Sequence, residues 1–269
     1  MSLNITSAVI KIAIDAGREI MDVYRRDFSV EQKEDDSPLT EADKRAHNII
    51  ARGLAEADPE TPVISEEGNA YPYEERKQWA SFWLVDPLDG TKEFIKKNDE
   101  FTVNIAKIED RYPVFGIIYV PAQDTLYIGG ASMGAYKVEK ASALEPIGEE
   151  ALKQHGVKLN VSVPETAAHV VASRSHMSEE TEAFINNLKE TYSAVDVVSA
   201  GSSLKFCLVA EGKAHFYPRY APTMEWDTGA GQAIVEAAGG EVIRHEDSRR
   251  FDYNREEQRN GWFLVQTVK

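Results

Sequence analysis

The segment 83–94 could do chemistry most directly, because two aspartates follow an apolar run and stand three residues apart. Asp86 and Asp89 precede a Gly-Thr pair (90–91) that is expected to begin a helix. Two carboxylates held this close repel each other unless a cation lies between them, and Mg²⁺ prefers such oxygen ligands. Backbone N–H groups at a helix start favour a phosphate, so metal and phosphate would meet here. The alternative is a surface turn whose aspartates bond their own backbone, and the segment alone leaves both interpretations open.

Three other parts of the sequence place acids at the end of an apolar run or at a helix start. Glu66 and Glu67 follow a short apolar run, although such pairs are usually only solvated. Asp227 lies at the start of a small-residue helix, where aspartate is a common N-cap. Asp43 stands three residues after Thr40, a spacing typical of a capping box with no further role. Each position is therefore ambiguous by itself.

Taken together and in this order, the acidic motifs resemble those of the inositol monophosphatase superfamily of Mg²⁺-dependent, lithium-sensitive phosphatases. The likeness covers nearly the whole chain. Its motifs are Asp-Ser-Pro-Leu-Thr-Glu-Ala-Asp (36–43), Ser-Glu-Glu (65–67), Asp-Pro-Leu-Asp-Gly-Thr (86–91) and Trp-Asp-Thr (226–228). Gly229 departs from the pattern, in which alanine is usual, and could loosen the start of that helix.

The resemblance implies two Mg²⁺ ions in one site, and a third, weaker ion near Glu66 stays open. The implied ligands are Glu66, Asp86 and the Leu88 carbonyl for the first ion, and Asp86, Asp89 and Asp227 for the second. Glu66 and Thr91 would orient a water on the first ion, with Asp43 as the other water-activating group. That water would attack phosphorus in line, without a covalent enzyme intermediate.

Two further motifs are similar to those of one branch of the superfamily, the bacterial 3′(2′),5′-bisphosphate nucleotidases of the CysQ type. They are Lys-Glu-Phe (92–94) and Gly-Ser-Ser-Leu-Lys-Phe (201–206). The likeness implies that Ser202 and Lys205 contact a 5′-phosphate or ribose, and Arg219 is a second cation for a phosphate. The other implied substrate contacts are Glu66, Leu88, Asp89, Gly90, Thr91 and Asp227, with Glu67, Arg174 and His176 as weaker candidates. Any of these cations could instead be merely solvated.

The predicted function is removal of the 3′-phosphate from adenosine 3′,5′-bisphosphate (PAP), giving AMP and phosphate in sulfate assimilation. Action on the sulfated precursor PAPS stays open. One alternative is an inositol-1-monophosphatase or broad sugar-phosphate phosphatase, distinguished by whether Lys205 and Arg219 line the pocket. The other is a noncatalytic divalent-ion-binding protein that kept the fold. Loss of an acid or of Thr91 would favour it, but all are present.

The composition limits the partners and the compartment. The 269 residues carry 45 Asp and Glu against 30 Lys and Arg, a net charge of −15, which disfavours nucleic-acid polymers and anionic membranes. Two Mg²⁺ would turn an acidic site into a phosphate trap, so strict metal dependence is predicted. No transmembrane or secretory segment is readable, and the single Cys207 has core spacing. A cytosolic protein is expected; peripheral attachment to the inner face of the inner membrane, and monomer or homodimer, stay open.

Two helices and four strands are predicted ahead of residue 140. Helical periodicity from Ile5 predicts a helix that ends near Arg26, and Thr40 begins a second helix that Asp58-Pro59 stops. Short apolar runs predict strands of one sheet at 62–64, 82–85, 101–105 and 114–120.

The second half of the chain alternates strands and helices. The stretch 141–158 lacks clean periodicity and is the predicted seam between two halves. The N-terminal α+β half (1–140) would carry most metal ligands. The C-terminal α/β half (159–269) would carry Asp227 and the nucleotide contacts. The resemblance implies a layered αβαβα sandwich, with two mixed sheets and helices between and outside them. Strands at 170–172 and 195–198 precede helices at 179–189 and 204–211, and a third helix continues through 233–238.

Overall fold

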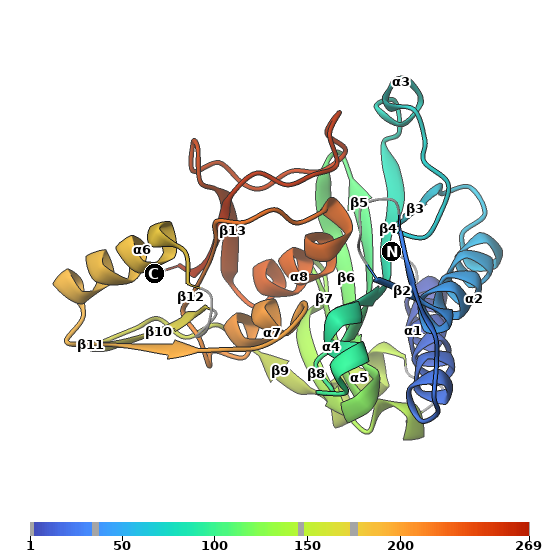
Figure 1. The fold of residues 1–269 in the computed structure, drawn as a ribbon, viewed down its shortest axis with the longest axis horizontal. Coiled ribbons are helices and arrows are strands. Elements are labelled where there is room, and N and C mark those ends of the chain that lie inside the picture. Colours follow the sequence, from blue (N-terminus) through green and yellow to red (C-terminus); the bar gives the residue numbers. More distant parts are fainter. Residues whose placement is uncertain (1–2, 34–37, 145–147, 173–176, 269) are drawn as a thin grey trace.

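The structure is a computed structural model that describes residues 3–33, 38–144, 148–172 and 177–268. Five layers of helices and sheets follow one another across the molecule (Figure 1). Helices α1 (Leu3–Tyr24) and α2 (Glu41–Ala57) cover one face of a seven-stranded sheet. Helices α7 (Leu204–Ala210) and α8 (Glu225–Ala237) separate that sheet from a five-stranded one, and α6 (Glu179–Thr191) lies outside. The αβαβα sandwich is therefore confirmed.

The seven-stranded sheet contains the strands that were expected, together with three more. The predicted runs are β3 to β6, adjacent in the sheet, with only the β3–β4 pair parallel. The sheet order is β3 (Val63–Ser65), β4 (Ser81–Asp89), β5 (Thr102–Glu109), β6 (Tyr112–Val120), β7 (Thr125–Gly130), β8 (Gly134–Glu139) and β9 (Val157–Leu159).

The predicted seam contains regular structure. Helix α5 (Glu149–His155) lies within it, and β9 at its end pairs with β8 of the first sheet. Residue Pro146 of this stretch lies outside the described residues. The division into halves remains a prediction. Helix α8, from the C-terminal part, packs on β5 and β6 of the first sheet and also contacts β13 of the second.

The five-stranded sheet is mixed, as expected. Strands β11, β10 and β12 are parallel to one another, whereas β14 is antiparallel to both of its neighbours, β12 and β13. In spatial order the strands are β11 (Ala194–Val198), β10 (Ala167–Val171), β12 (Phe216–Arg219), β14 (Phe263–Thr267) and β13 (Gly240–Arg244). The helices that follow β10 and β11 are α6 and α7, which confirms the predicted alternation.

Short elements connect these layers near the acidic motifs. A hairpin of β1 (Val30–Gln32) and β2 (Pro38–Thr40) precedes α2, and α4 (Thr91–Lys96) follows β4. Helix α3 (Tyr73–Arg76) and 3₁₀ turns at 121–123 and 141–143 complete the elements. The turn residues Asp36 and Ser37 lie outside the described residues.

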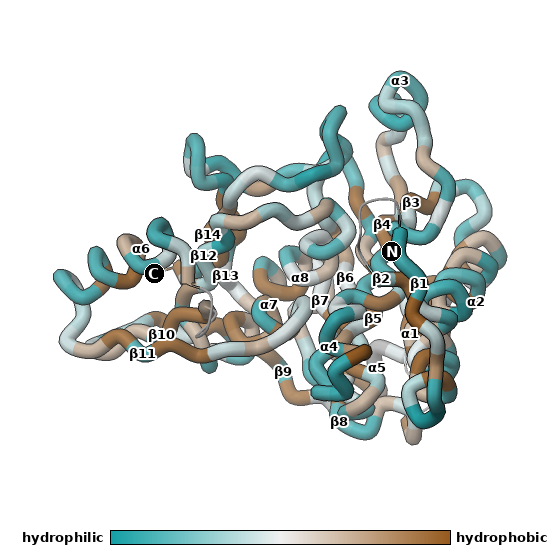
Figure 2. The backbone as a smooth tube through the Cα atoms, viewed as in Figure 1, coloured by the Kyte–Doolittle hydropathy of each residue, from teal (hydrophilic) through white to brown (hydrophobic). Residues whose placement is uncertain are grey.

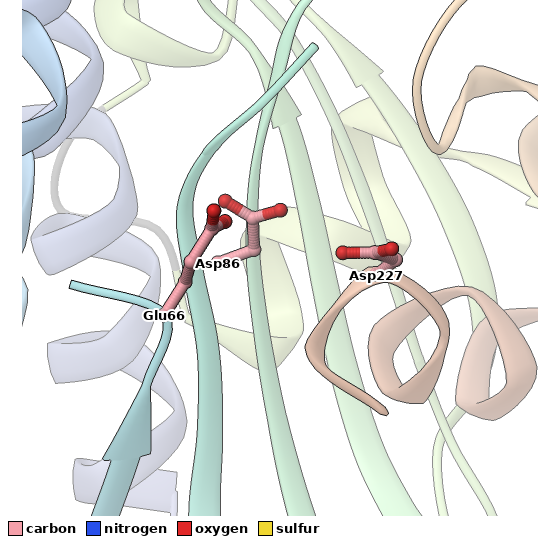
Figure 3. Close-up of side chains that lie close together, drawn as sticks. All are labelled: Glu66, Asp86 and Asp227. Carbon is pink, nitrogen blue, oxygen red and sulfur yellow. The ribbon is translucent and has the colours of Figure 1, made fainter. Parts of the chain in front are cut away.

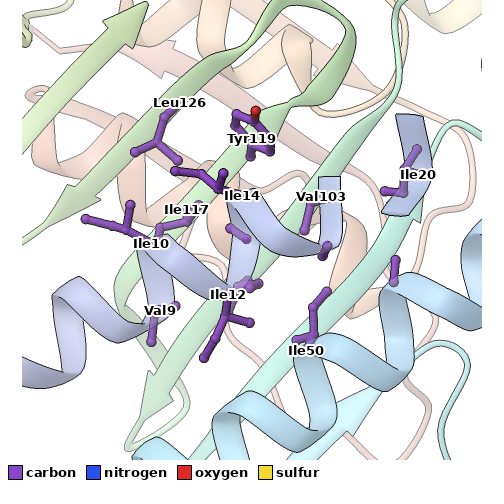
Figure 4. Close-up of a cluster of buried hydrophobic side chains, with 14 of the residues drawn as sticks. Val9, Ile10, Ile12, Ile14, Ile20, Ile50, Val103, Ile117, Tyr119 and Leu126 are labelled. Atoms are coloured by element: carbon purple, nitrogen blue, oxygen red, sulfur yellow. The ribbon is translucent and has the colours of Figure 1, made fainter. Parts of the chain in front are cut away.

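Apolar side chains on the inner helix faces build two main cores. Figure 4 shows α1 laying Ile10 and Ile14 against Ile117 and Tyr119 of β6, all buried. Hydrophobic stretches follow the inner strands and helix faces, whereas outer turns are hydrophilic (Figure 2). This burial drives the docking of α1, since apolar side chains gain by leaving water. None of the helices in the described residues combines the length and apolar composition that a bilayer crossing needs.

Glycines allow α8 to lie directly on the first sheet. A Cβ on Gly116 of β6 would approach the Ala230 carbonyl oxygen to 2.5 Å, and one on Gly229 would lie 3.1 Å from Leu84. The family position usually filled by alanine is therefore a close helix-to-sheet contact here. The single cysteine, Cys207, is 1% exposed and belongs to the same core, as expected.

Candidate active site

Three carboxylates from separate elements converge between the first sheet and α8. Glu66 follows β3, Asp86 lies on β4 and Asp227 lies in the first turn of α8. One oxygen of each lies within 4.8 Å of the others, and Figure 3 shows the three groups turned toward one space. The sequence prediction that these acids meet is confirmed for this trio.

Burial and mutual repulsion make this cluster a site for a cation. Burial raises the pKa of Asp86 well above its usual range, and the charges of Glu66, Asp89 and Asp227 raise it further. Burial, followed by the charge of Asp89, raises the pKa of Asp227 to about 8. A divalent cation would remove this repulsion, and carboxylate oxygens are the ligands that Mg²⁺ prefers. The donor set therefore fits a hard metal ion.

Asp89 lies beside the trio and is oriented by two neutral donors. Its Oδ2 accepts from Ser203 Oγ at 2.7 Å and from Asn104 Nδ2 at 3.4 Å. Strand β4 continues through the predicted Pro-Leu turn to Asp89, with an irregular pairing to β5 between Asp86 and Asp89. The segment is therefore not a surface turn, because residues 82–88 are buried in the sheet. Asp86 does bond the local backbone as that interpretation expected, since its Oδ1 accepts from the Leu88 N–H at 3.0 Å.

Asp43 both caps α2 and contacts Thr91. Its Oδ2 accepts from the backbone N–H of Thr40 at 2.7 Å, which confirms the capping box. Its Oδ1 lies 3.2 Å from the Thr91 hydroxyl, which is also 3.4 Å from the Leu88 carbonyl oxygen. Burial raises the pKa of Asp43 although Thr40 opposes this rise. Asp43, the third residue of α2, is thus linked to the helix start at the metal-ligand cluster.

The first turn of α8 holds Asp227 as its third residue. The carboxylate accepts from the backbone N–H of Met224 at 2.8 Å, so Met224 rather than Asp227 occupies the cap position. The N-cap interpretation of Asp227 is therefore wrong, because its side chain reaches back from inside the helix. The remaining carboxylate oxygen is left to the cluster.

A cavity of about 410 Å³ opens above the carboxylates. We name it the metal-ligand cavity. Two cations also line it, Lys92 and Arg259. Its acidic and backbone walls come from Glu66, Asp86, Leu88, Asp89, Gly90, Thr91, Glu93 and Asp227.

Comparison with known proteins places this arrangement in a family. The model of the inositol monophosphatase family matches residues 2–260. The chain belongs to that family. The 3′(2′),5′-bisphosphate nucleotidase CysQ of Salmonella typhimurium is 44% identical over 237 residues, which are 87% of this chain and 88% of that protein. CysQ of Escherichia coli K12 gives the same identity and coverage.

Solved structures agree with this family assignment. CysQ from Bacteroides thetaiotaomicron, described as a bacterial member of the inositol monophosphatase family, has a TM-score of 0.86 and 44% identity. The match covers 97% of this chain and 96% of that one. The SuhB protein of Bartonella henselae, at 22% identity and a TM-score of 0.72, shares the fold.

In this family member, the predicted phosphate-binding cations line a second cavity of about 280 Å³ next to the first. We name it the cationic cavity. Lys205 Nζ donates to the Ser202 carbonyl at 3.0 Å, and burial lowers the pKa of Lys205. Ser202 Oγ and Arg219 Nε are buried and have no hydrogen-bond partner in the described structure. Ser202 also has a left-handed φ of 42°, which is unusual for a non-glycine residue.

The two cavities share walls, and a third continues beyond them. Asp89, Gly90 and Asp227 line both the metal-ligand and the cationic cavity. Lys205 and Arg219 line both the cationic cavity and a further cavity of about 330 Å³ with Val171, Met177 and Tyr220 in its walls. The cationic cavity therefore adjoins the metal-ligand cavity on one side and the third cavity on the other.

Several contacts of the site involve residues that no sequence motif indicated. Lys33 Nζ donates to Glu66 Oε1 at 2.7 Å and also bonds Glu67. Burial alone would lower the pKa of Lys33, but the bonds to these two glutamates together outweigh it and raise that pKa. Burial raises the pKa of Glu67. Asn104 was detectable in principle, since it is a polar residue between Val103 and Ile105 in the buried part of β5. Arg174 and His176, the weaker candidates, lie outside the described residues.

Proposed function

We propose that this chain is a magnesium-dependent phosphomonoesterase that removes the 3′-phosphate of adenosine 3′,5′-bisphosphate. The observation that carries the proposal is the shared wall between the metal-ligand cavity and the cationic cavity. A substrate with two phosphates needs one position for each. The bisphosphate nucleotidase activity named for the relatives at 44% identity supports the same substrate.

Glu66, Asp86, Asp89, Asp227 and the Leu88 carbonyl would hold two Mg²⁺ ions in this proposal. When bound, the ions would polarise the phosphoryl oxygens and lower the pKa of a water. The attacking water would give its proton to the Thr91 hydroxyl, which would pass its own proton to Asp43, and the leaving 3′-oxygen would take a proton from another water. The Thr91 hydroxyl lies 3.2 Å from Asp43 Oδ1, and burial raises the pKa of that carboxyl, which makes it a better base than a surface aspartate.

Ser202, Lys205 and Arg219 would bind the 5′-phosphate. Each offers a buried polar group to the cationic cavity, and two of these groups lack a protein partner. A buried donor without a partner is costly, and a phosphate oxygen would satisfy it. The nucleoside would extend into the third cavity, where Val171 and Met177 offer apolar contacts.

The deciding experiment is a phosphate-release assay with adenosine 3′,5′-bisphosphate, inositol 1-phosphate and fructose 1,6-bisphosphate. Each substrate is assayed with Mg²⁺ and with excess EDTA. We expect the bisphosphonucleoside to be hydrolysed with the highest kcat/KM, and only with metal. Equal rates on all three would favour a broad sugar-phosphate phosphatase, and no release from any would favour a noncatalytic ion-binding protein.

Action on PAPS, a cytoplasmic location, peripheral membrane attachment, a third ion and the choice between monomer and homodimer remain predictions. Lithium inhibition is expected from family membership, and the same assay would test it.

A further inference from the structure

Arg259 is held in a defined position beside the start of α8, although no motif includes it. The Gln258 carbonyl accepts from the Glu225 N–H at 2.9 Å, and the Asn260 N–H donates to the Thr223 carbonyl at 2.8 Å. Arg259 therefore pairs with Met224, the residue whose N–H bonds the Asp227 carboxylate. The backbone that carries the arginine is thus coupled directly to a proposed metal ligand.

Buried polar side chains fix this backbone on both sides of the arginine. Asn260 is 5% exposed, and its amide donates to the Met224 carbonyl at 2.7 Å. On the other side, the fully buried Glu225 accepts from the N–H groups of Asn254 and Arg255 at 3.1 and 3.0 Å. Such a network holds a segment in one conformation. The backbone from which the Arg259 side chain extends is consequently held in place.

The guanidinium itself is left without an ionic partner. Arg259 is exposed and lines the metal-ligand cavity together with five acids, yet it makes no hydrogen bond or salt bridge with any residue in the described ranges. Its neighbours differ, since Arg244 pairs with Asp247 and Arg255 with Glu225. An arginine whose backbone is fixed at the edge of this cavity, and whose guanidinium is bound to no carboxylate of the described residues, is available to an anion that enters it.

We propose that Arg259 binds the phosphoryl group that is removed, a role that rests on the proposed function. Two divalent ions would balance the four carboxylates of Glu66, Asp86, Asp89 and Asp227, so a phosphate dianion would bring charge that the ions do not offset. A guanidinium supplies one positive charge and two parallel N–H donors that match two phosphate oxygens. Arg259 thus serves the phosphate that reacts, whereas Lys205 and Arg219 serve the one that stays.

The kinetic test compares Arg259→Gln with Arg249→Gln. Arg249→Gln changes the net charge by the same amount as Arg259→Gln. Arg249 is 78% exposed and lines none of the three cavities, so its replacement should leave the site intact. Both are assayed on adenosine 3′,5′-bisphosphate and on 3′-AMP, which lacks the 5′-phosphate. For Arg259→Gln we expect kcat/KM to fall about tenfold to a hundredfold, by the same factor on both nucleotides. Arg249→Gln should stay within about twofold of wild type.

A binding measurement separates this inference from the proposed function. Inorganic phosphate is titrated calorimetrically into the Mg²⁺-loaded proteins, and its Kd should rise about tenfold or more in Arg259→Gln alone. Unchanged kcat/KM and Kd would overturn the assignment, as would a loss confined to the bisphosphate, which would place Arg259 at the 5′-phosphate. If wild type hydrolyses neither nucleotide, the proposed function fails, while the phosphate titration still decides the role of Arg259.

Discussion

The metal-ligand cavity and the cationic cavity share the acids Asp89, Glu93 and Asp227, but the first adds Glu66 and Asp86 whereas the second adds Lys205 and Arg219. In the first, Asp86 and Asp227 repel each other and neighbouring acids, and burial with this repulsion raises their pKa values. In the second, burial lowers the pKa of Lys205, and Ser202 Oγ has no partner in the described structure. A cation would relieve the repulsion in the first cavity, and an anion would pair with Lys205 and Arg219 in the second.

The difference between the cavities lies in how the protein positions the charges. The acids come from the ends and bulge of buried strands and from a helix start, where backbone hydrogen bonds leave little freedom. The cations come from α7 and β12, and Lys205 reaches the cavity on a long stem. We therefore expect that substitutions in the two cavities affect bond breaking and substrate selection separately. The following predictions test that separation.

Removing the metal should have the largest effect, because it leaves the acidic cavity repelling any phosphate. In excess EDTA we expect phosphate release from adenosine 3′,5′-bisphosphate to fall to background, and added Mg²⁺ to restore it. Calorimetric titration of Mg²⁺ into the metal-free protein measures the binding directly. Undiminished turnover in EDTA would contradict the metal assignment.

Asp89→Asn should come next, since it removes a proposed metal ligand while keeping an amide oxygen for Ser203 and Asn104. We expect kcat to fall at least about a hundredfold with an unchanged circular dichroism spectrum. The matched control is Asp196→Asn, on the edge strand β11 and 70% exposed, which should behave as wild type. Near-normal turnover of the Asp89 variant would remove this residue from the metal site.

Lys205→Met should separate the two cavities, because the methionine keeps the apolar stem and removes the charge. We expect KM for adenosine 3′,5′-bisphosphate to rise about tenfold or more, with little change for 3′-AMP. Lys213→Met is the control, since that lysine is 59% exposed and pairs with Glu211. An equal rise for both nucleotides would exclude Lys205 from reading the 5′-phosphate.

The smallest of the expected effects is a change in the stability of the metal-free protein. Unlike the losses of activity above, it is a gain, because Asp227→Asn should stabilise the folded state. A carboxylate whose folded pKa is raised to about 8 destabilises the folded state as the pH rises from its unfolded value, near 4, toward 8. At pH 7 the variant should therefore melt several degrees higher, since each kcal/mol shifts Tm of such a domain by about 2–4 °C. The difference should vanish near pH 4, and a lower Tm at pH 7 would contradict the repulsion.

Much of the fold follows from local signals. The capping box at Thr40 and Asp43, the apolar periodicity of α1 and the runs that became β3 to β6 were all readable from neighbouring residues. The short strand β9 was not, because three residues carry no period and its place depends on pairing with β8. Strands β12 to β14 likewise depend on antiparallel partners that lie far along the chain.

Residue types and spacing are enough to show which charged side chains the chain offers: the acids after β3, along β4 and in α8, and the cations around Ser202. Which of these side chains meet depends on how the helices and sheets pack. Asp227 reaches Glu66 and Asp86 because close glycine contacts seat α8 on the first sheet. Arg259 joins the same cavity because a backbone bridge fixes it opposite Met224. Such encounters between distant segments depend on packing and pairing, which residue types and spacing do not encode locally.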